Sequence, residues 1–292
     1  MGQNPSSNYV ICMDASGDII REAAEENGIA FVPMEYSLGD EMRTSRGCEE
    51  EALLKKFYDG QRAGDLTRTS QIPPFMYEEY FKDFLEEGKS VLYFCLSSGL
   101  SSTYESALLA AENLKEQYPE AGIFPVDTLA ATGGIGILAE RAIENRKKGM
   151  SIGENVEDMK AFVPHLRHYF MVQDLMYLKR GGRVSAATAI VGSALNIRPI
   201  LKIDESGKLV TVDKKRGNKA AMSSLFTFFK EHYNPEVCNT IYICDADTPE
   251  LADSLVEKVR EAAPELTVRR TMLSPIIGAH TGPGMLSMIM AC

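Results

Sequence analysis

The sequence predicts an α/β protein whose N-terminal domain is a parallel sheet with flanking helices and whose C-terminal domain is a mixed or antiparallel sheet with helices. In the first half, apolar runs typical of buried strands alternate with segments of helical periodicity, and this order indicates a parallel sheet. In the second half, two runs joined at residues 205–207 indicate a β-hairpin. The length of 292 residues favours two domains, which we place at 8–153 and 154–292.

In the N-terminal domain, apolar runs predict the strands and the periodic segments between them predict the helices. One helix is expected after Pro73 and Pro74, because proline suits the first turn of a helix. Another is expected to begin with a capping box of Ser102 and Glu105. The expected strands are 9–13, 29–34, 91–96 and 122–126, the expected helices are 19–27, 48–62, 75–87, 102–114 and 129–148, and 64–71 is expected to be a loop.

The same reasoning in the C-terminal domain predicts the hairpin and further strands between helices. A basic glycine turn at 179–183 is expected to precede a helix, and the chain ends in an apolar run at 285–291. The expected strands are 169–172, 199–203, 208–213, 240–244 and 266–271, and the expected helices are 156–166, 186–195, 217–233 and 249–262.

A strand that ends in hydroxyl residues is the first candidate site. The apolar run 91–96 precedes Ser97, Ser98, Ser101, Ser102 and Thr103, after which a helix begins. Helix N-termini carry partial positive charge and free backbone N–H groups, which attract anions. The stretch contains no Lys, Arg or His, so it suits a carboxylate or carboxylic acid better than a polyphosphate. Alternatively, these residues only cap the helix and fill a turn.

Other polar residues stand near the ends of predicted strands and helices. Thr69 and Ser70 are expected to be extended because prolines follow them, and they either cap the next helix or add donors to the site at Ser101. Asp18 is expected to cap the helix that follows it. The role of Asp14 stays open, since it ends the first strand, where parallel α/β folds bind ligands.

Composition and charge argue against several classes of function. The net charge of −10 disfavours nucleic acid and anionic membranes as partners. The six cysteines form no C-x-x-C pair, which indicates free thiols in a reducing compartment, so we expect a cytoplasmic protein. No apolar run approaches ~18 residues, so we expect neither a signal peptide nor membrane insertion. The four histidines show no metal-ligand spacing, so we expect no metal.

Three further features each have a simple structural explanation. Gly134 and Gly136 match a dinucleotide fingerprint weakly, and small residues for close helix packing explain them better. His165 and His168 are expected on the surface at a helix end. The basic cluster at 214–219 is either a solvated face or a docking patch for an acidic or phosphorylated partner.

Six short motifs follow one another along the chain: Asp14-Ala15-Ser16, Thr69-Ser70-Gln71, the stretch 97–104, the stretch 179–183, Lys215-Arg216-Gly217 and the stretch 280–284. In this order they resemble the DegV family of fatty-acid-binding proteins, and the resemblance covers essentially the whole chain. Two positions depart from the family pattern. Ser102 stands where the family usually has glycine, and Ile72 separates Gln71 from Pro73, where the family tends to have proline directly.

The resemblance implies two α/β domains with one long-chain fatty acid between them and the acyl chain in an apolar tunnel. By motif, Thr69 and Ser101 would hydrogen-bond the carboxyl group, with His280 in the same network and Ser70 and Ser102 as further donors. The resemblance also implies a carrier rather than an enzyme, with the bound fatty acid as ligand and no other cofactor.

Bacterial members of this family serve as the acyl-carrying subunit of a fatty acid kinase. The resemblance therefore implies a separate ATP-dependent kinase subunit as partner, which phosphorylates the bound carboxylate to an acyl-phosphate for phospholipid synthesis. Arg183 and Arg216 would lie at the exit of the tunnel, facing the kinase subunit or the phosphate. Their replacement by alanine is then expected to spare lipid binding and abolish phosphorylation.

A serine esterase is the main alternative function. The order Ser101, then Asp245 or Asp247, then His280 matches the triad order of α/β-hydrolases. However, residues 99–103 lack the second glycine of the G-x-S-x-G motif. A sugar or dihydroxyacetone-type kinase is a further alternative, but it needs a nucleotide site and the sequence contains no P-loop.

Overall fold

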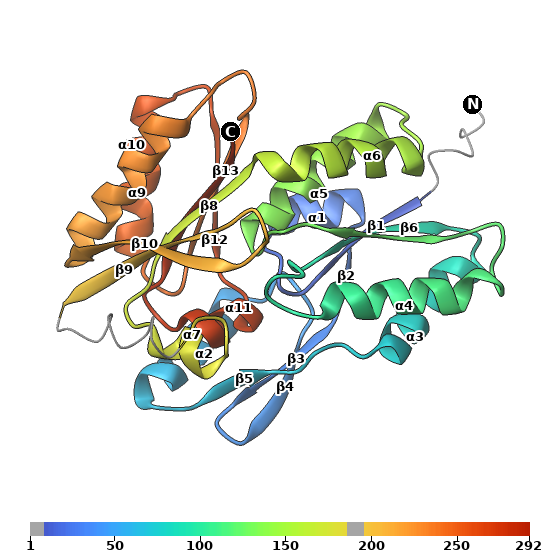
Figure 1. Ribbon diagram of the computed structural model, residues 1–292, viewed down its shortest axis with the longest axis horizontal. Coiled ribbons are helices and arrows are strands. Elements are labelled where there is room, and N and C mark those ends of the chain that lie inside the picture. Colours follow the sequence, from blue (N-terminus) through green and yellow to red (C-terminus); the bar gives the residue numbers. More distant parts are fainter. Residues whose placement is uncertain (1–8, 186–195) are drawn as a thin grey trace.

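The computed structural model describes residues 9–185 and 196–292, and it contains two α/β parts side by side (Figure 1). One part is built on a parallel sheet and the other on a mixed sheet, which confirms the predicted fold class. The helix predicted at 186–195 lies outside the described residues. Within the described ranges, every helix is too short or too polar to cross a bilayer.

The N-terminal sheet is parallel, as predicted. Its strands are β1 (Tyr9–Asp14), β2 (Ala30–Val32), β6 (Ser90–Cys95) and β7 (Ile123–Asp127), in the order β2-β1-β6-β7. Its helices are α1 (Arg21–Asn27), α3 (Pro74–Glu86), α4 (Thr103–Lys115), α5 (Gly133–Lys147) and α6 (Ile152–Phe162). Helices α3 and α4 pack together on one face, while α5 and α6 cover the other (Figure 1). The carboxyl ends of β1, β6 and β7 therefore meet at one edge.

A three-stranded antiparallel sheet in the N-terminal half was not predicted. It consists of β3 (Met34–Leu38), β4 (Glu41–Ser45) and β5 (Thr67–Thr69), in the order β4-β3-β5, with α2 (Glu51–Ala63) packed on β3. The predictions of one strand over 29–34 and of a loop over 64–71 are therefore wrong. Strand β5 has only three residues and is held by non-local pairing, with Thr69 opposite Tyr36, so no local pattern marks it.

The C-terminal sheet is mixed, as predicted. Its strands are β8 (Leu166–Met171), β9 (Ile197–Ile203), β10 (Leu209–Arg216), β11 (Thr240–Asp245), β12 (Thr267–Met272) and β13 (Leu286–Ala291), in the order β10-β9-β8-β13-β11-β12. Among the described strands of this sheet, only β11 and β12 pair in parallel, and β9 and β10 form the predicted hairpin. Helices α9 (Asn218–His232) and α10 (Pro249–Ala262) pack on one face of this sheet.

Helix α5 joins the two parts because it packs on both sheets. It contacts β1 and β6 on one side and β8, β11 and β13 on the other. A Cβ atom on Gly134 would lie 2.3 Å from Nε2 of His168, and one on Gly136 would lie 2.3 Å from the backbone oxygen of Asp18. The prediction that these glycines serve close helix packing is therefore confirmed.

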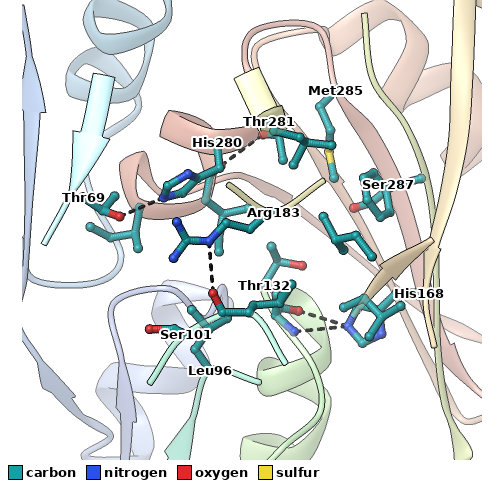
Figure 2. A pocket seen from close by; sticks show the side chains of 18 of the residues that line it. Thr69, Leu96, Ser101, Thr132, His168, Arg183, His280, Thr281, Met285 and Ser287 are labelled. Atoms are coloured by element: carbon teal, nitrogen blue, oxygen red, sulfur yellow. Dashed lines mark hydrogen bonds between the residues drawn. The ribbon is translucent and has the colours of Figure 1, made fainter. Parts of the chain in front are cut away.

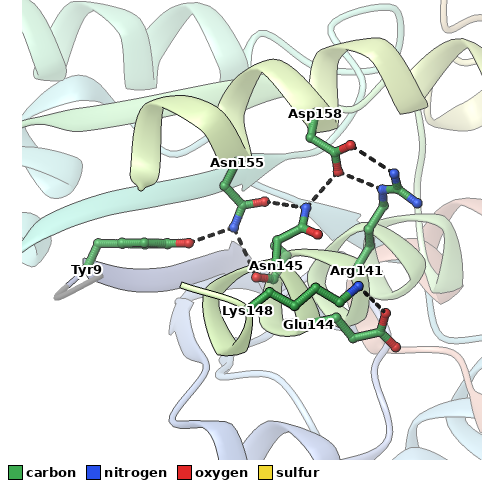
Figure 3. A network of polar contacts seen from close by, with 8 residues as sticks. Tyr9, Arg141, Glu144, Asn145, Lys148, Asn155 and Asp158 are labelled. Carbon is green, nitrogen blue, oxygen red and sulfur yellow. Dashed lines mark hydrogen bonds and ion pairs between the residues drawn. The ribbon is translucent and has the colours of Figure 1, made fainter. Parts of the chain in front are cut away.

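A buried polar network fixes α6 on α5 and on the start of β1 (Figure 3). The Nδ2 group of Asn155 donates to the hydroxyl of Tyr9 at 2.7 Å. Asn145 donates to Oδ1 of Asn155 at 3.1 Å and to Asp158 at 2.6 Å. Arg141 completes the network with two hydrogen bonds to Asp158. Helix α6 also contacts β6 and β7, so it packs on the N-terminal sheet. The domain boundary after residue 153 stays a prediction.

The predictions about the starts of α1 and α5 are wrong. Asp18 does not cap α1, because the N-cap of this helix is Ile20. The carboxylate of Asp18 instead accepts the backbone N–H of Ser274 at 3.1 Å. This N–H precedes α11 (Pro275–Thr281), a short helix that the sequence patterns did not reveal. Helix α5 begins at Gly133 rather than at 129, because Leu129 and Thr132 have positive φ angles, which no helix permits.

Candidate ligand-binding site

Two aspartates, Asp14 (buried) and Asp127 (half-buried), hold the loop between β6 and α4 from both sides. Asp14, at the end of β1, accepts the backbone N–H of Leu96 at 2.8 Å. Asp127, at the end of β7, accepts the backbone N–H of Ser98 at 3.1 Å and also its hydroxyl. Burial raises the pKa of Asp14, and its hydrogen bonds with Ser16, Leu96 and Tyr93 oppose this rise. Asp14, whose role the sequence left open, thus positions this loop.

The loop presents Ser101 and Ser102 at the start of α4. The hydroxyl of Ser101 lies 2.7 Å from that of Thr103 and is half-buried. Ser102 occupies the N-cap position, but its side chain makes no capping hydrogen bond, so the predicted capping box with Glu105 is wrong. The ψ angle of Ser102 is 21°, outside the extended region that capping requires. Its exposed side chain is therefore free to face a ligand.

Thr69 and His280 meet from elements that are 211 residues apart in the sequence. Thr69 ends β5, and its hydroxyl oxygen lies 2.8 Å from Nε2 of His280 on α11 (Figure 2). The contact forms because α11 packs on β5 and β3. Burial, and secondarily the charge of Arg183, lower the pKa of His280 to about 4. The imidazole is therefore neutral at pH 7.

These side chains line one cavity of about 420 Å³ between the two sheets (Figure 2). This size lies within the range of small-molecule sites, about 300–1,000 Å³. Its polar part contains all five predicted carboxyl ligands: Thr69, Ser70, Ser101, Ser102 and His280. Its apolar wall comes from both halves of the chain: Met34, Leu96, Leu100, Phe170, Leu178, Ile203, Leu209, Ile276, Ile277, Met285 and Ile289.

A cation also lies in the cavity wall, which the serine-rich stretch by itself did not suggest. Arg183 follows α7 (Met176–Arg180), and its Nε donates to the backbone oxygen of Leu100 at 3.0 Å. A second guanidinium N–H donates to the backbone oxygen of Gly181. Arg183 comes 83 residues after Leu100 in the chain. Local spacing therefore could not place it in the site, and only the motif at 179–183 indicated its role. Arg216 is exposed at the end of β10 and is not part of the cavity wall.

A family model described as uncharacterised protein, DegV family, matches residues 8–291. This chain belongs to the DegV family. A DegV domain-containing protein of Clostridium perfringens is 35% identical over 280 residues, which cover 96% of each chain. The solved structure of DegV, a fatty acid binding protein from Bacillus subtilis, matches with a TM-score of 0.83 and 27% identity over 98% of this chain and 99% of that one.

The same fold occurs in the Streptococcus pneumoniae fatty acid kinase B3 protein, whose crystal structure was solved with linoleic acid. It matches this DegV chain with a TM-score of 0.84 over 97% of this chain and 99% of that one, at 22% identity. At this identity, the likeness shows that the two proteins share a fold.

The residues of the alternative hydrolase triad are engaged elsewhere in this DegV structure. Asp245 accepts the backbone N–H of Thr248 at 2.8 Å and pairs with Arg270 at 3.2 Å. Asp247 pairs with Arg62. Within residues 9–185 and 196–292, His280 bonds Thr69 and neither Ser101 nor a carboxylate. The geometry therefore does not form the nucleophile–base–acid chain that an esterase needs.

Three polar cavity residues were missed at the sequence level. His168, predicted to be on the surface, is 5% exposed on β8 and faces the cavity with Thr132 and Ser287 (Figure 2). The prediction was wrong because the run at 169–172 begins earlier than expected, which places His168 in the strand rather than at a helix end. Leu166, His168 and Phe170 alternate with Arg167 and Tyr169, as the inward and outward positions of a strand do. This alternation was the signal available for placing His168 in a strand.

Acid is expected to destabilise the protein through His168. Burial lowers the pKa of His168 from 6.5 to about 4, so the unfolded chain takes up a proton below pH 6.5 and the folded chain does not until about pH 4. This contribution to stability is complete above pH 6.5 and is lost as the pH falls. Between pH 7 and pH 4, we expect the free energy of unfolding to fall in both the unchanged protein and His168→Leu. The fall should be about 3 kcal/mol larger in the unchanged protein. Urea titrations of both proteins measure this difference, and parallel pH profiles would contradict it.

Proposed function

We propose that this protein binds one long-chain fatty acid, with its tail along the apolar cavity wall and its carboxyl group at Thr69 and Ser101. Ser70, Ser102 and His280 lie beside these two residues and complete the headgroup site. The observation that carries the proposal is a single cavity that joins a hydroxyl-rich part to an apolar part. Each buried methylene contributes about 0.8 kcal/mol, so a long tail supplies most of the affinity.

The headgroup site suits one carboxyl group. A buried carboxylate is costly unless several donors meet it, and hydroxyls at Thr69 and Ser101 are such donors. Neutral His280 holds the Thr69 hydroxyl at 2.8 Å and so orients it. The guanidinium of Arg183 lies in the same cavity wall and provides a positive charge near the carboxylate.

We further propose that the cytoplasmic protein presents the bound acid to an ATP-dependent kinase subunit, which forms the acyl-phosphate. Arg183 is placed to contact the new phosphate, and exposed Arg216 to contact the partner. The motifs at 179–183 and 215–217 support the step with the kinase subunit. The related DegV of Bacillus subtilis is a fatty acid binding protein, which supports the binding of the acid itself. No cofactor other than the fatty acid is required for this role.

The central test is to identify what the purified protein carries. Extraction under denaturing conditions followed by mass spectrometry is expected to release about one fatty acid per chain. Delipidated protein is expected to take up added fatty acid to the same ratio. If no lipid is extracted and none is taken up, the proposal is wrong.

Arg216→Ala is expected to leave fatty-acid binding unchanged and to abolish phosphorylation by the kinase subunit. The reason is that Arg216 is exposed and outside the cavity wall, so it can contact a partner but not the buried acid. Binding is measured by titration and phosphorylation by transfer of labelled phosphate from ATP. Arg260→Ala, an exposed arginine on α10, is the control and should change neither. If the fatty acid bound to Arg216→Ala is phosphorylated at the normal rate, the basic cluster at 214–219 is only a solvated face.

A further inference from the structure

The cavity has a second polar region that a plain hydrocarbon tail does not use. His168 and Thr132 lie on the opposite side of the cavity from Thr69 (Figure 2). His168 is 5% exposed and Thr132 3% exposed, so neither side chain is reached from the outer surface of the folded chain. Both side chains line the cavity, and a few polar groups in a largely apolar cavity wall are what fixes the orientation of a ligand.

His168 retains an unused ring nitrogen. Its Nε2 lies 3.2 Å from the backbone oxygen of Ala131 and 3.4 Å from the backbone N–H of the same residue. Gly134 leaves room for this ring edge, since a Cβ there would lie 2.3 Å from Nε2. The other ring nitrogen, Nδ1, forms no hydrogen bond with any residue in 9–185 or 196–292. With Nε2 donating to the closer oxygen, Nδ1 is an acceptor.

Thr132 stands beside it in a strained backbone conformation. Its φ angle is 53°, which is unusual for a β-branched residue. The residue lies in the cavity wall just before α5. Its hydroxyl makes no hydrogen bond with the part of the chain that the structure describes. Ser287, from β13, donates to the backbone oxygen of Cys244 at 3.1 Å and retains acceptor capacity.

We propose that this region binds a hydroxyl group within the acyl chain, so that the preferred ligand is a hydroxylated fatty acid. This inference rests on the proposed function, since it assumes that the carboxyl group lies at Thr69. A ligand hydroxyl can donate to Nδ1 of His168 and accept from the hydroxyl of Thr132. A second carboxylate is disfavoured because Thr132, His168 and Ser287 are neutral. Among the described residues that line the cavity, Arg183 is the one Lys or Arg, and it bonds the backbone oxygens of Leu100 and Gly181.

The test compares stearic acid with the positional isomers of monohydroxystearic acid on delipidated protein. We expect at least one isomer to bind about tenfold more tightly than stearic acid, which corresponds to about 1.4 kcal/mol. In His168→Leu this preference should disappear or reverse, because the oxygen then meets an apolar side chain. His165→Leu, at the exposed histidine just before β8, is the control and should retain the preference.

Each outcome decides a different claim. If stearic acid and all isomers bind equally to the unchanged protein, the second polar region is not a ligand site, although the carrier role stands. If no acid of either kind binds, the proposed function itself fails. Should His168→Leu fail to fold, as judged by circular dichroism, Thr132→Val replaces it, because valine keeps the shape of threonine and removes only the hydroxyl. An unchanged preference in the folded variant would overturn the assignment.

Discussion

Replacing Thr69 with alanine is expected to weaken fatty-acid binding by about 1–3 kcal/mol, or roughly five- to 150-fold. The hydroxyl of Thr69 is a proposed carboxyl donor, and its loss leaves a buried carboxyl oxygen without a partner. The effect has a second source, because His280 also loses the group that it contacts at 2.8 Å. Ser101→Ala is expected to have a similar effect, since Ser101 faces the same part of the cavity from the start of α4.

Binding constants are measured by calorimetric titration of delipidated protein with one fatty acid. Thr44→Ala is the matched control, because Thr44 is an exposed threonine on β4 of the same small sheet. Its affinity should equal that of the unchanged protein. If neither Thr69→Ala nor Ser101→Ala differs from this control, the carboxyl group binds elsewhere in the cavity.

Gly136→Ala is expected to lower the free energy of unfolding by about 3 kcal/mol, the upper part of the usual range for overpacking. The added Cβ would lie 2.3 Å from the backbone oxygen of Asp18 and 3.0 Å from the ring of Tyr242. A backbone oxygen cannot rotate away as the end of a flexible side chain can. Helix α5 must therefore shift, and this weakens its packing between the two sheets.

Gly153→Ala is the matched control for this prediction. Gly153 is also helical, on α6, but a Cβ there meets nothing within 4 Å. Alanine has the higher helix propensity, so this variant is expected to gain about 0.5–1 kcal/mol. Urea unfolding with an unchanged slope measures both free energies. Equal effects of the two substitutions would show that α5 is not tightly enclosed.

Most of the regular structure could be predicted from local patterns. The run at 91–96, the hairpin around 205–207 and the helix Pro249–Ala262 each carry their own periodicity or turn signal, and each forms as predicted. The motifs were sufficient to group Thr69, Ser101 and His280 as one site, and the structure places all three in one cavity wall. Local patterns failed for short elements, such as β5 and α11, that are held by contacts with distant segments.

The sequence by itself determined the α/β class, the two-part organisation and the family of this protein, because periodicity and motif order are written along the chain. Only the tertiary structure decided that Arg183 enters the cavity and that His168 and Thr132 face it from the opposite side. It also decided that Asp14 positions a loop and that Asp18 bonds Ser274 rather than capping α1. The physical reason is that these roles depend on which distant backbone groups reach a side chain, and sequence spacing carries no information about that.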